Sequence, residues 1–521
     1  MCMSTVHPAD TVQSWSLEQQ DIFEWFRTSK VVLNAHSVDP TCEIVEHLVV
    51  RARAGTGKTT TIVKGVGFAP EQRILVGAFN KRNAEELTAR LSQVNPRAVA
   101  KTFHSIGFGC VQRFWSGVRV DEKRSDRLSR ADWLTEKVCG GIAPDAIKKL
   151  VSRLHTISRE IAPHASQPGD LKQIAVTFEC EPDDAWETTR FNLDYVEAKA
   201  LEAMELAAST KPVETGIDFA DMIFLPVRNG WMMKSWDLVV IDEAQDMTVA
   251  QLELARGVCR GRVCVVGDDR QAIYAFRGAD ADSLDRLKAE LGAAELGLTT
   301  TYRCGHAIVR LATEIVPDFR AGASNPEGII SSILDDSTYT NLRKSITVGD
   351  FLLSRVNAPL VAVAMSLLRS GVRARIAGRD IGTGLKVIIR RLAKGSAAHS
   401  IPQLIARINA WETKDVARYT AAKREDKVAL VRDQADTLIT LTDGAKNVHD
   451  VEARIDALFT DDGLGQAGVV TCSSVHRAKG LEANRVFILG DTLRNHTTEE
   501  MNIQYVAITR AKRELVFVST K

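Results

Sequence analysis

The stretch Arg51-Ala-Arg-Ala-Gly-Thr-Gly-Lys-Thr-Thr60 decides the fold of the first half of the chain. It follows the apolar run His47-Leu-Val-Val50, which predicts a buried strand, and it precedes Thr61-Ile-Val-Lys64, which can continue as a helix. A strand, a tight glycine turn and a helix N-terminus together gather backbone N–H groups at one point. The stretch therefore predicts a phosphate-binding loop.

Each position of this loop has an expected task. Gly55 and Gly57 let the backbone approach phosphate oxygens closely, Lys58 reaches the β- and γ-phosphates of ATP, and Thr59 holds Mg²⁺ through its hydroxyl. The phosphate-loop pattern asks for Gly at position 52, where this chain has Ala. The predicted cofactors are ATP and Mg²⁺, and the predicted nucleotide contacts of the loop are Ala54, Gly55, Thr56, Gly57, Lys58, Thr59 and Thr60.

Length and composition limit the class of protein. A chain of 521 residues is too long for one ordinary core, and roughly three or four domains are expected. The chain has 67 Lys and Arg residues against 66 Asp and Glu residues, a net charge of +1, so its overall charge does not indicate nucleic-acid binding. A local basic groove is still compatible with this balance.

Cysteine spacing and hydropathy limit the compartment. The nine cysteines are scattered without a Cys-x-x-Cys pair, which argues against a zinc ribbon or an iron–sulfur cluster and suits a reducing compartment. No apolar run approaches the ~18 residues of a membrane span, and Met1–Thr5 lacks the charged and apolar regions of a signal peptide. We expect a cytoplasmic protein with no membrane partner.

A second motif lies within Trp236–Asp246, where the four apolar residues Leu238–Ile241 predict a strand. The strand ends in Asp242-Glu243, which delivers two carboxylates to the ligand edge of a parallel sheet. Asp242 is expected to join the Mg²⁺ shell, and Glu243 to orient or deprotonate the attacking water. The alternative is a pair of acids capping a strand in solvent, and the upstream phosphate loop favours the catalytic interpretation.

A third motif, Gly267–Gly278, follows the strand predicted at Arg262–Val266. Gln271 lies at the strand tip, where an amide can sense a γ-phosphate. Tyr274, Phe276 and Arg277 place aromatic rings beside a cation, the combination found in platforms that stack single-stranded bases. For Phe276 taken by itself, a core position is the alternative.

Helix and strand signals divide the chain into four parts. Strand-and-helix alternation runs through residues 1–109 and 216–297, and again through 298–379 and 466–521, while residues 110–215 and 380–465 are mainly helical. The fold class predicted is therefore α/β, with two parallel-sheet lobes, each carrying a helical insertion. The charge run 122–127 is expected to be a solvated face, and the basic helix 386–394 either faces water or touches a phosphate backbone.

A series of motifs in fixed order carries a resemblance to a known family. Over essentially its whole length the chain resembles the UvrD/Rep/PcrA-like superfamily 1 DNA helicases. The matching segments are Glu18-Gln-Gln20, Ala54–Thr59, Phe79-Asn-Lys81, Thr102-Phe-His-Ser105, Asp242–Asp246, Gly267–Gly278, Tyr302-Arg303, His476–Glu482 and Tyr505–Lys512.

The resemblance implies a fold of two RecA-like lobes with ATP in the cleft between them, and it implies roles for further residues. Gln19 would read the adenine and Tyr302 would stack on the base. Arg303 and Arg510 would reach the γ-phosphate from the second lobe, and Glu482 would lie near the ribose or the γ-phosphate edge. The implied catalytic set is Lys58, Asp242, Glu243, Gln271, Arg303 and Arg510.

The resemblance also implies a DNA face and shows departures from the family. Position 502, often Arg in the family, is Asn here, and the second insertion is shorter than in large members. The chain ends after its last strand, so we expect neither a nuclease domain nor a long partner-binding tail. The DNA-facing residues implied are Phe79, Asn80, Lys81, Phe103, His104, Tyr274, Phe276, Arg277, Arg355 and His476.

Three functions are compatible with these observations. The first is an ATP-driven helicase that translocates on single-stranded DNA, 3′ to 5′ by family analogy, and separates duplex at single-strand/double-strand junctions. The second is a DNA-stimulated ATPase that strips proteins from DNA or is the motor subunit of a repair, replication or anti-phage complex, without strong unwinding. The third is a nucleotide-gated DNA-binding module with a decayed site, which the complete set of catalytic residues disfavours.

Overall fold

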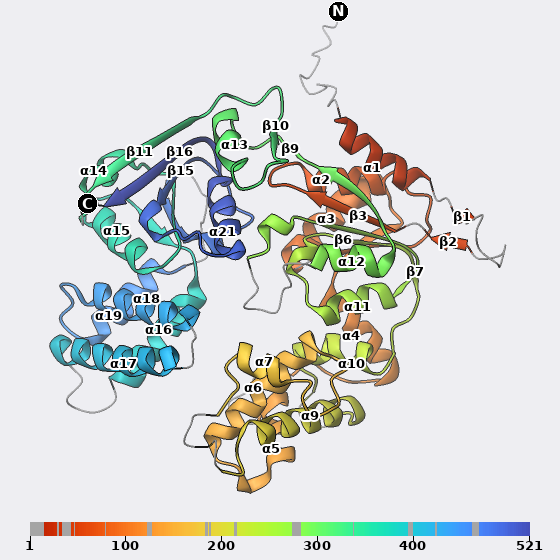
Figure 1. Cartoon of the computed structure of the whole chain (residues 1–521), viewed down its shortest axis with the longest axis horizontal. Helices are drawn as coiled ribbons and strands as arrows, with labels where there is room; N and C mark the ends of the chain where they lie inside the picture. Colours follow the sequence, from red (N-terminus) through yellow and green to blue (C-terminus); the bar gives the residue numbers. More distant parts are fainter. Residues whose placement is uncertain are drawn as a thin grey trace, which may run out of the picture. The chain divides into compact units, whose positions relative to one another are not determined.

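The computed structural model describes residues 15–28, 31–33, 43–45, 47–78, 80–121, 128–182, 186, 189–212, 216–273, 283–336, 338–393, 400–421, 425–460 and 468–520. Its contacts divide the chain into two compact units (Figure 1). Residues 1–52 and 57–298 form the first unit, and residues 53–56 and 299–521 form the second. The predicted change between the two halves at 297/298 lies one residue from this division. The predicted ends of the insertions stay predictions.

The first unit is built on a parallel six-stranded sheet with the strand order β5-β4-β6-β7-β3-β8. The apolar runs of the sequence form its central strands, which are buried on both faces, as in a sheet covered by helices. The strands are β3 (Leu48–Ala52), β4 (Ile74–Ala78), β5 (Ala98–Thr102), β6 (Trp236–Ile241), β7 (Cys259–Gly267) and β8 (Ala294–Leu298).

Strand order fixes which loops meet at one edge of this sheet. β7 pairs with both β3 and β6, with Val266 opposite Val50 and Val265 opposite Ile241. Because all these strands are parallel, the segments after residues 52, 241 and 267 leave the sheet at the same edge, where ligands bind in α/β proteins.

Helices surround this sheet, and their starts follow ordinary capping chemistry. Ser16 and Gln19 form a reciprocal capping box at α1, Asn80 caps α3, and Thr248 with Gln251 forms a second capping box at α11. The helices are α1 (Leu17–Arg27), α2 (Lys58–Val66), α3 (Lys81–Val94), α4 (Phe103–Phe114), α10 (Phe219–Arg228), α11 (Val249–Gly257) and α12 (Ser283–Leu291). A short antiparallel pair, β1 (Val31–Leu33) and β2 (Glu43–Val45), lies between α1 and β3 in the sequence.

The helical segment after α4 packs around a core of its own. Its helices are α5 (Arg130–Cys139), α6 (Asp145–Ile161), α7 (Lys172–Thr177) and α9 (Leu193–Ser209). Buried apolar side chains such as Leu134, Val151 and Met204 join α4 and α10 in the same cluster. Figure 1 shows these helices as a separate group reached through α4 and α10.

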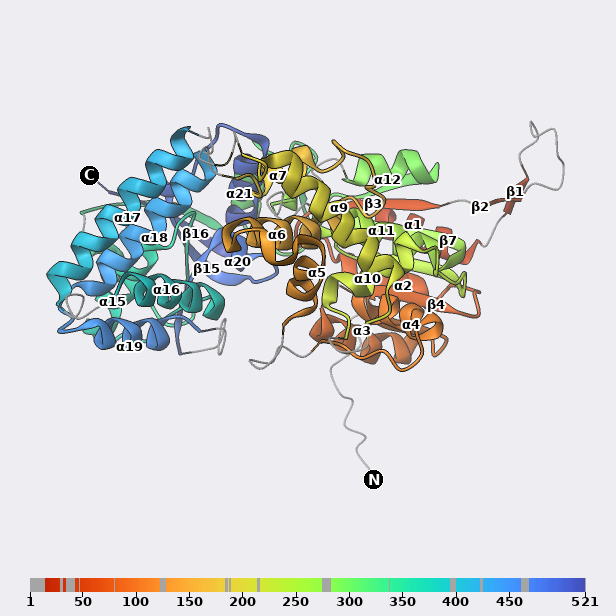
Figure 2. The ribbon, with the colours of Figure 1, turned by 90° about the horizontal axis from the view of Figure 1, so that it is seen from below.

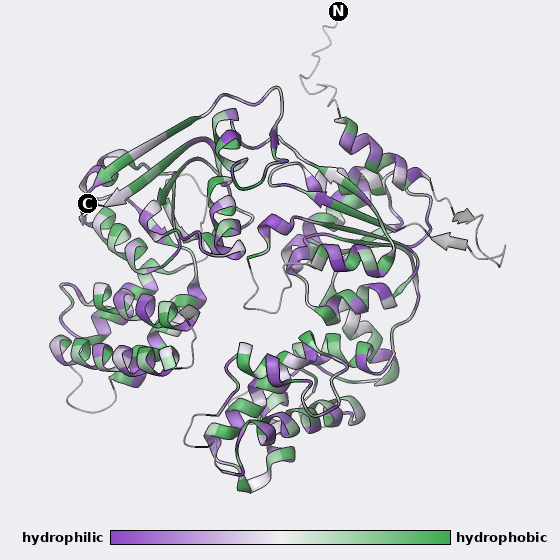
Figure 3. Cartoon of the chain, viewed as in Figure 1, coloured by the Kyte–Doolittle hydropathy of each residue, from purple (hydrophilic) through white to green (hydrophobic). Residues whose placement is uncertain are grey.

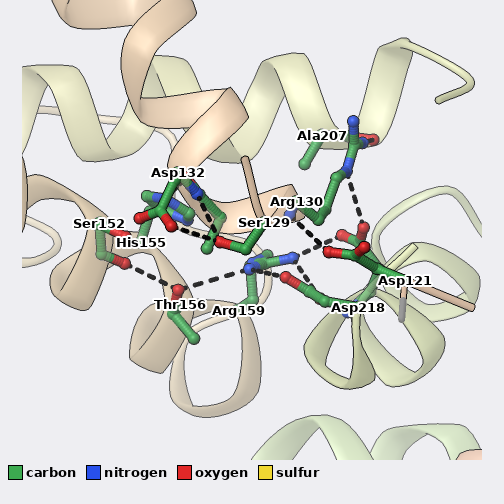
Figure 4. Close-up of polar contacts among 12 residues, drawn as sticks. Asp121, Ser129, Arg130, Asp132, Ser152, His155, Thr156, Arg159, Ala207 and Asp218 are labelled. Atoms are coloured by element: carbon green, nitrogen blue, oxygen red, sulfur yellow. Dashed lines mark hydrogen bonds and ion pairs between the residues drawn. The ribbon is translucent and has the colours of Figure 1, made fainter. Parts of the chain in front are cut away.

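A buried ionic network ties this helical group to α10 (Figure 4). Arg159 of α6 donates to both carboxylate oxygens of Asp218, at 2.9 and 2.8 Å, and to Asp221 at 2.6 Å. Arg130 of α5 donates to the other oxygen of Asp221 at 3.0 Å, and its N–H is held by Asp121. Both guanidinium groups are fully buried, so the paired carboxylates are what makes their burial tolerable.

The second unit repeats the parallel-sheet arrangement with the order β11-β16-β15-β12-β14-β13. Its strands are β11 (Ile329–Asp335), β12 (Phe351–Ser354), β13 (Ala374–Ile376), β14 (Val470–Ser474), β15 (Ala483–Leu489) and β16 (Ala511–Thr520). A separate two-residue parallel pair joins β9 (Thr300–Thr301) to β10 (Arg320–Ala321), and both strands precede β11 in the sequence. The apolar colour in Figure 3 runs through the strands of both sheets.

Helices of the second unit fall into two sets. Those between the strands are α13 (His306–Ala312), α14 (Thr340–Ser345), α15 (Ala358–Arg369), α20 (Val475–Ala478) and α21 (Thr498–Ile508). Between β13 and β14 the described residues form the helices α16 (Arg379–Leu392), α17 (Ile401–Ala421), α18 (Glu425–Thr442) and α19 (Val448–Leu458), and Phe459 makes an isolated β-bridge with Ile376. Figure 2 shows α17 and α18 side by side.

The mixed α/β architecture with two parallel sheets and helical segments confirms the predicted fold class. None of the helices in the described part of the chain is both long enough and apolar enough to cross a bilayer.

Candidate nucleotide and DNA site

The first unit builds the start of a phosphate cradle as the sequence predicts. Buried β3 ends at Ala52 and α2 begins at Lys58, directly after Gly57. Gly57 has φ +80°, a left-handed conformation that favours glycine, and no side chain caps the helix. The first N–H groups of α2 are therefore left without a capping side chain, and these groups with the helix dipole favour an anion.

Four polar side chains lie together at the ends of β3 and β6. Thr59 donates its hydroxyl to Asp242 Oδ2 at 3.1 Å, and Lys58 Nζ lies 3.7 Å from Glu243 Oε2. The helix thus supplies a cation and a hydroxyl, and the strand supplies two carboxylates. This is the grouping that the sequence predicts for the loop and the second motif.

The two carboxylates differ in environment. Burial and, after it, the neighbouring Glu243 carboxylate raise the pKa of Asp242 to about 6, against the opposing effects of Lys58 and the Thr59 hydroxyl. Glu243 has φ +54°, an uncommon backbone conformation for a non-glycine residue, and its N–H donates to Asp242 Oδ1 at 2.9 Å. A bound divalent cation would favour the charged form of Asp242.

Gln19 lies beside the loop, with its amide already engaged. Its Nε2 donates to Thr61 Oγ1 at 3.0 Å, and its Oε1 accepts from the Ser16 N–H at 3.1 Å. The side chain is buried and closes the N-terminus of α1 onto α2. Thr60 also has a partner within the unit, because Arg90 donates to its hydroxyl at 3.1 Å. An adenine contact by Gln19 stays a prediction.

Residues 53–56 of the loop belong to the second unit, and their polar groups have partners there. The Ala54 N–H donates to the Tyr505 hydroxyl at 3.0 Å, and the Gly55 carbonyl accepts from the Tyr302 N–H at 2.9 Å. The Thr56 hydroxyl donates to the Arg53 carbonyl at 2.9 Å. Gly55 has φ +70°, so a side chain there would be strained.

The second unit gathers three of its predicted nucleotide residues. Arg303 Nε lies 2.5 Å from Glu482 Oε2, and Lys512 Nζ lies 2.6 Å from Glu482 Oε1. Burial alone would raise the pKa of Glu482, but the two cations prevail and lower it. Arg510 is 1% exposed and donates to the Val506 and Leu481 carbonyls. Burial and then Arg303 lower the pKa of Arg510 to about 10, so the guanidinium stays charged at neutral pH.

The other residues of the second unit that the sequence predicts to bind nucleotide or DNA lie on different elements. Tyr302 is 48% exposed and leaves much of its ring accessible. Arg355 follows β12 and makes a two-pronged pair with Glu500 at 3.0–3.1 Å, so a phosphate would have to compete with that carboxylate. His476 lies half-buried in the short helix α20.

The predicted DNA-facing residues of the first unit divide by exposure. Asn80 and Lys81 are exposed at the start of α3, where Lys81 pairs with Glu85 at 3.8 Å. Phe103 is 3% exposed and packs against Gly77 in the core, so its expected position on the surface is corrected. Phe79, Tyr274, Phe276 and Arg277 lie outside the described residues.

Phe219, which contacts His104, is a candidate DNA-facing residue that the sequence argument did not single out. The His104 ring packs edge-on against Phe219, with 5.4 Å between ring centres, and Phe219 is 64% exposed at the start of α10. Burial lowers the pKa of His104, which favours its neutral form. The available signal in the sequence was an aromatic residue directly after Asp218, which caps α10. Figure 4 shows Asp218 beside its partner Arg159.

These residues fit a nucleotide with its metal ion. The uncapped N-terminus of α2 and Lys58 suit phosphate oxygens, and Thr59 with Asp242 supplies the hydroxyl and carboxylate oxygens that Mg²⁺ prefers. Fold and loop together define a phosphate-loop nucleotide-binding protein with two parallel-sheet units.

Comparison with known proteins narrows this class. Residues 33–291 match the family model of the UvrD/REP helicase N-terminal domain, and residues 469–518 match that of the UvrD-like helicase C-terminal domain. Together the matches cover more than half of the chain, and the chain belongs to the UvrD/Rep-like family of superfamily 1 DNA helicases.

Two of the relatives that this chain matches are much longer proteins. F-box DNA helicase protein 1 of Schizosaccharomyces pombe is 25% identical over 91% of this chain, and ATP-dependent DNA helicase Rep of Escherichia coli is 28% identical over 60% of it. The matches cover 56% and 47% of those proteins. ATP-dependent DNA helicase UvrD2 of Mycobacterium bovis is 24% identical over 89% of this chain and 75% of its own length. The chain thus spans about half the length of the first two relatives.

Proposed function

We propose that the protein is an ATP-dependent DNA helicase that translocates on single-stranded DNA, 3′ to 5′, and couples ATP hydrolysis to duplex separation. The observation that carries the proposal is the joint placement of Lys58, Thr59, Asp242 and Glu243 where β3 and β6 end. Family membership and the names of the relatives support it. A position on nucleoid DNA in the cytoplasm is part of this proposal.

The residues of the first unit divide the chemical work. Bound Mg²⁺–ATP supplies the phosphoryl group and a metal ion that neutralises developing charge. Lys58 and the N–H groups of α2 bind the phosphate oxygens, and Thr59 with Asp242 holds the metal. Glu243 orients the attacking water and takes up its proton, and Gln271 senses the γ-phosphate.

We assign the cations Arg303 and Arg510 of the second unit to the γ-phosphate. In comparable phosphoryl-transfer sites an arginine of this kind accelerates the reaction by about 10³–10⁵-fold. Arg303 is now paired with Glu482, so its turn toward a phosphate requires exchange of one anion for another. Such an exchange makes the conformation depend on the presence of the γ-phosphate. Tyr302 would stack on the base, and Glu482 would lie near the ribose.

We assign DNA binding in the first unit to the exposed residues Asn80, Lys81 and Phe219, together with the half-buried His104. Lysine and asparagine suit backbone phosphates, and an exposed aromatic ring suits stacking on an unpaired base. In the second unit Arg355 and His476 would contact the backbone. The expected partners are single strands and junctions between single and double strands.

ATP turnover with and without single-stranded DNA tests the proposal. Wild-type protein is expected to hydrolyse ATP faster when single strands are added, and Glu243→Gln is expected to bind ATP but lose at least about a hundredfold in kcat. Turnover that ignores single-stranded DNA, or a fully active Glu243→Gln variant, would contradict the proposed function.

One observation favours a second candidate function, in which the ATPase moves on DNA without strong unwinding. The helical segment of the second unit runs only from α16 to α19. The protein would then strip bound proteins or serve as the motor of a repair, replication or anti-phage complex. A forked-duplex assay separates the two candidates, because DNA-stimulated turnover without strand displacement supports the second and overturns the first.

A further inference from the structure

Gln245 is a fully buried amide between two motifs, with no role assigned so far. It lies in the short 3₁₀ turn η2 (Ala244–Asp246), directly after the two acidic residues that follow β6. A buried amide carries both a donor and an acceptor, and each costs free energy when it has no partner. The partners of Gln245 therefore indicate what its burial achieves.

Both ends of this amide are used, and they join two strand tips. Nε2 donates to Glu243 Oε2 at 2.6 Å, and Oε1 accepts from the Asp268 N–H at 3.0 Å. The first partner follows β6 and the second follows β7. A Cβ on Gly267 would lie 2.7 Å from Gln245 Oε1, so the amide fills a space that only glycine leaves open.

The connection continues to the third motif. Asp268 is fully buried, and its Oδ2 accepts from Gln271 Nε2 at 2.6 Å. The Gln271 N–H also donates to the Asp268 carbonyl at 2.9 Å, within the turn η3 (Asp269–Gln271). A continuous path of hydrogen bonds thus runs from the Glu243 carboxylate through Gln245 and Asp268 to the Gln271 amide.

Among the described contacts of Glu243, the hydrogen bond from Gln245 is the short one to its carboxylate. The Glu243 backbone is in the left-handed region, and its N–H is tied to Asp242. The pair with Lys58 is 3.7 Å long, beyond hydrogen-bond distance. The short contact from Gln245 is charge-assisted, and such hydrogen bonds fix geometry more strongly than neutral ones.

We propose that Gln245 is a positioning residue: it holds the Glu243 carboxylate in place for the attacking water and links its position to that of Gln271. A change at the γ-phosphate sensor would then be transmitted to Glu243 through Asp268 and Gln245. The part of this inference that concerns rate rests on the proposed function, while the part that concerns the linkage does not.

Two substitutions separate the two ends of the amide, and a third is a control. Gln245→Met keeps the length of the side chain but removes donor and acceptor. Gln245→Glu keeps an acceptor for the Asp268 N–H but removes the donor and places a carboxylate against Glu243. Gln251→Met removes a buried amide of the α11 capping box, which does not touch Glu243.

Steady-state ATP turnover with saturating single-stranded DNA gives the first readout. Gln245→Met and Gln245→Glu are expected to lower kcat by about 10- to 100-fold, with KM for ATP within about twofold of wild type, because the phosphate-binding residues are untouched. Gln251→Met is expected to keep the wild-type kcat. Wild-type kcat in Gln245→Met, or equal loss in Gln251→Met, overturns the positioning role.

Amide hydrogen exchange of the protein without nucleotide gives the second readout. The Asp268 N–H is expected to exchange at least about tenfold faster in Gln245→Met than in wild type, and to stay protected in Gln245→Glu. Unchanged protection in Gln245→Met overturns the linkage. If the wild-type protein fails to hydrolyse ATP, the proposed function fails, and this exchange measurement still decides whether Gln245 joins the two strand tips.

Discussion

A change of pH from 7.5 to 5.0 is expected to weaken the helical segment of the first unit through one histidine. His155 of α6 is completely buried, and its Nε2 lies 3.2 Å from Thr135 Oγ1. Burial, followed by the neighbouring Arg159 and Arg130 guanidinium groups, lowers its pKa from 6.5 to about 3, against the opposing effects of Asp218 and the Ala131 carbonyl. Figure 4 shows the ring beside this charged network.

The sign and size follow from proton binding in the two states. Between pH 6.5 and about 3 the unfolded chain protonates His155, whereas the folded chain keeps it neutral. The unfolded state therefore binds more protons, and the free energy of unfolding falls as the pH drops below 6.5. At 1.36 kcal/mol per pH unit, the loss at pH 5.0 is about 2 kcal/mol.

Hydrogen exchange of the α6 amides, corrected for the intrinsic pH dependence of exchange, measures this loss. His155→Gln has no group that titrates in this range, so its opening free energy is expected to lack about 2 kcal/mol of the wild-type decrease between pH 7.5 and 5.0. His449→Gln, at an exposed position in the second unit, is the matched control and is expected to behave as wild type. Equal decreases in wild type and His155→Gln would refute the reasoning.

Three further predictions concern the ion network, the DNA face and the metal site. Arg159→Met leaves carboxylates buried beside it without their guanidinium and is expected to destabilise the first unit by about 3–5 kcal/mol in urea unfolding, whereas the more exposed Arg153→Met on the same helix changes little. Phe219→Ala is expected to weaken single-stranded DNA binding by ~1–3 kcal/mol in fluorescence anisotropy, and an effect no larger than that of Phe114→Ala, another exposed aromatic, would contradict its stacking role. Thr59→Val is expected to raise the Mg²⁺ concentration for half-maximal ATP turnover by about 10- to 100-fold, and an unchanged Mg²⁺ titration would remove Thr59 from the metal site.

The local sequence was enough to predict those features that depend on backbone conformation and strand order. Gly55 and Gly57 both adopt positive φ, so the glycine positions of the loop report a real conformational need. Asp242 and Glu243 follow a buried parallel strand, and parallel strands bring their carboxyl ends to one edge. The predicted strands at 238–241 and 262–266 therefore lie within the observed strands β6 and β7.

Two of the four edge strands, β8 and β11, escaped the sequence argument because their patterns are weak. β8 contains Glu and Gly and lies at one edge of the first sheet, and β11 is mostly exposed at one edge of the second. Neither has the continuous apolar run that marks a central strand, and each is recognised only through its pairing partner.

Side-chain partners also escaped it, since they depend on contacts between distant segments. Phe103 was expected at a surface, but the open space above Gly77 accommodates its ring in the core. Gln245 carries no signal of its own beyond its place after two acids, and only the approach of β7 shows what its amide joins. Similarly, the pairing of Glu482 with Lys512 needed the fold of the second unit.

Turnover by Lys58→Ala measures the central claim most directly, because that claim makes Lys58 the cation that binds the phosphates during DNA-stimulated hydrolysis. With saturating single-stranded DNA, ATP and Mg²⁺, the variant is expected to fall to the background rate while wild-type protein turns over. A Lys58→Ala protein that still hydrolyses ATP at the wild-type rate on single strands would contradict the account.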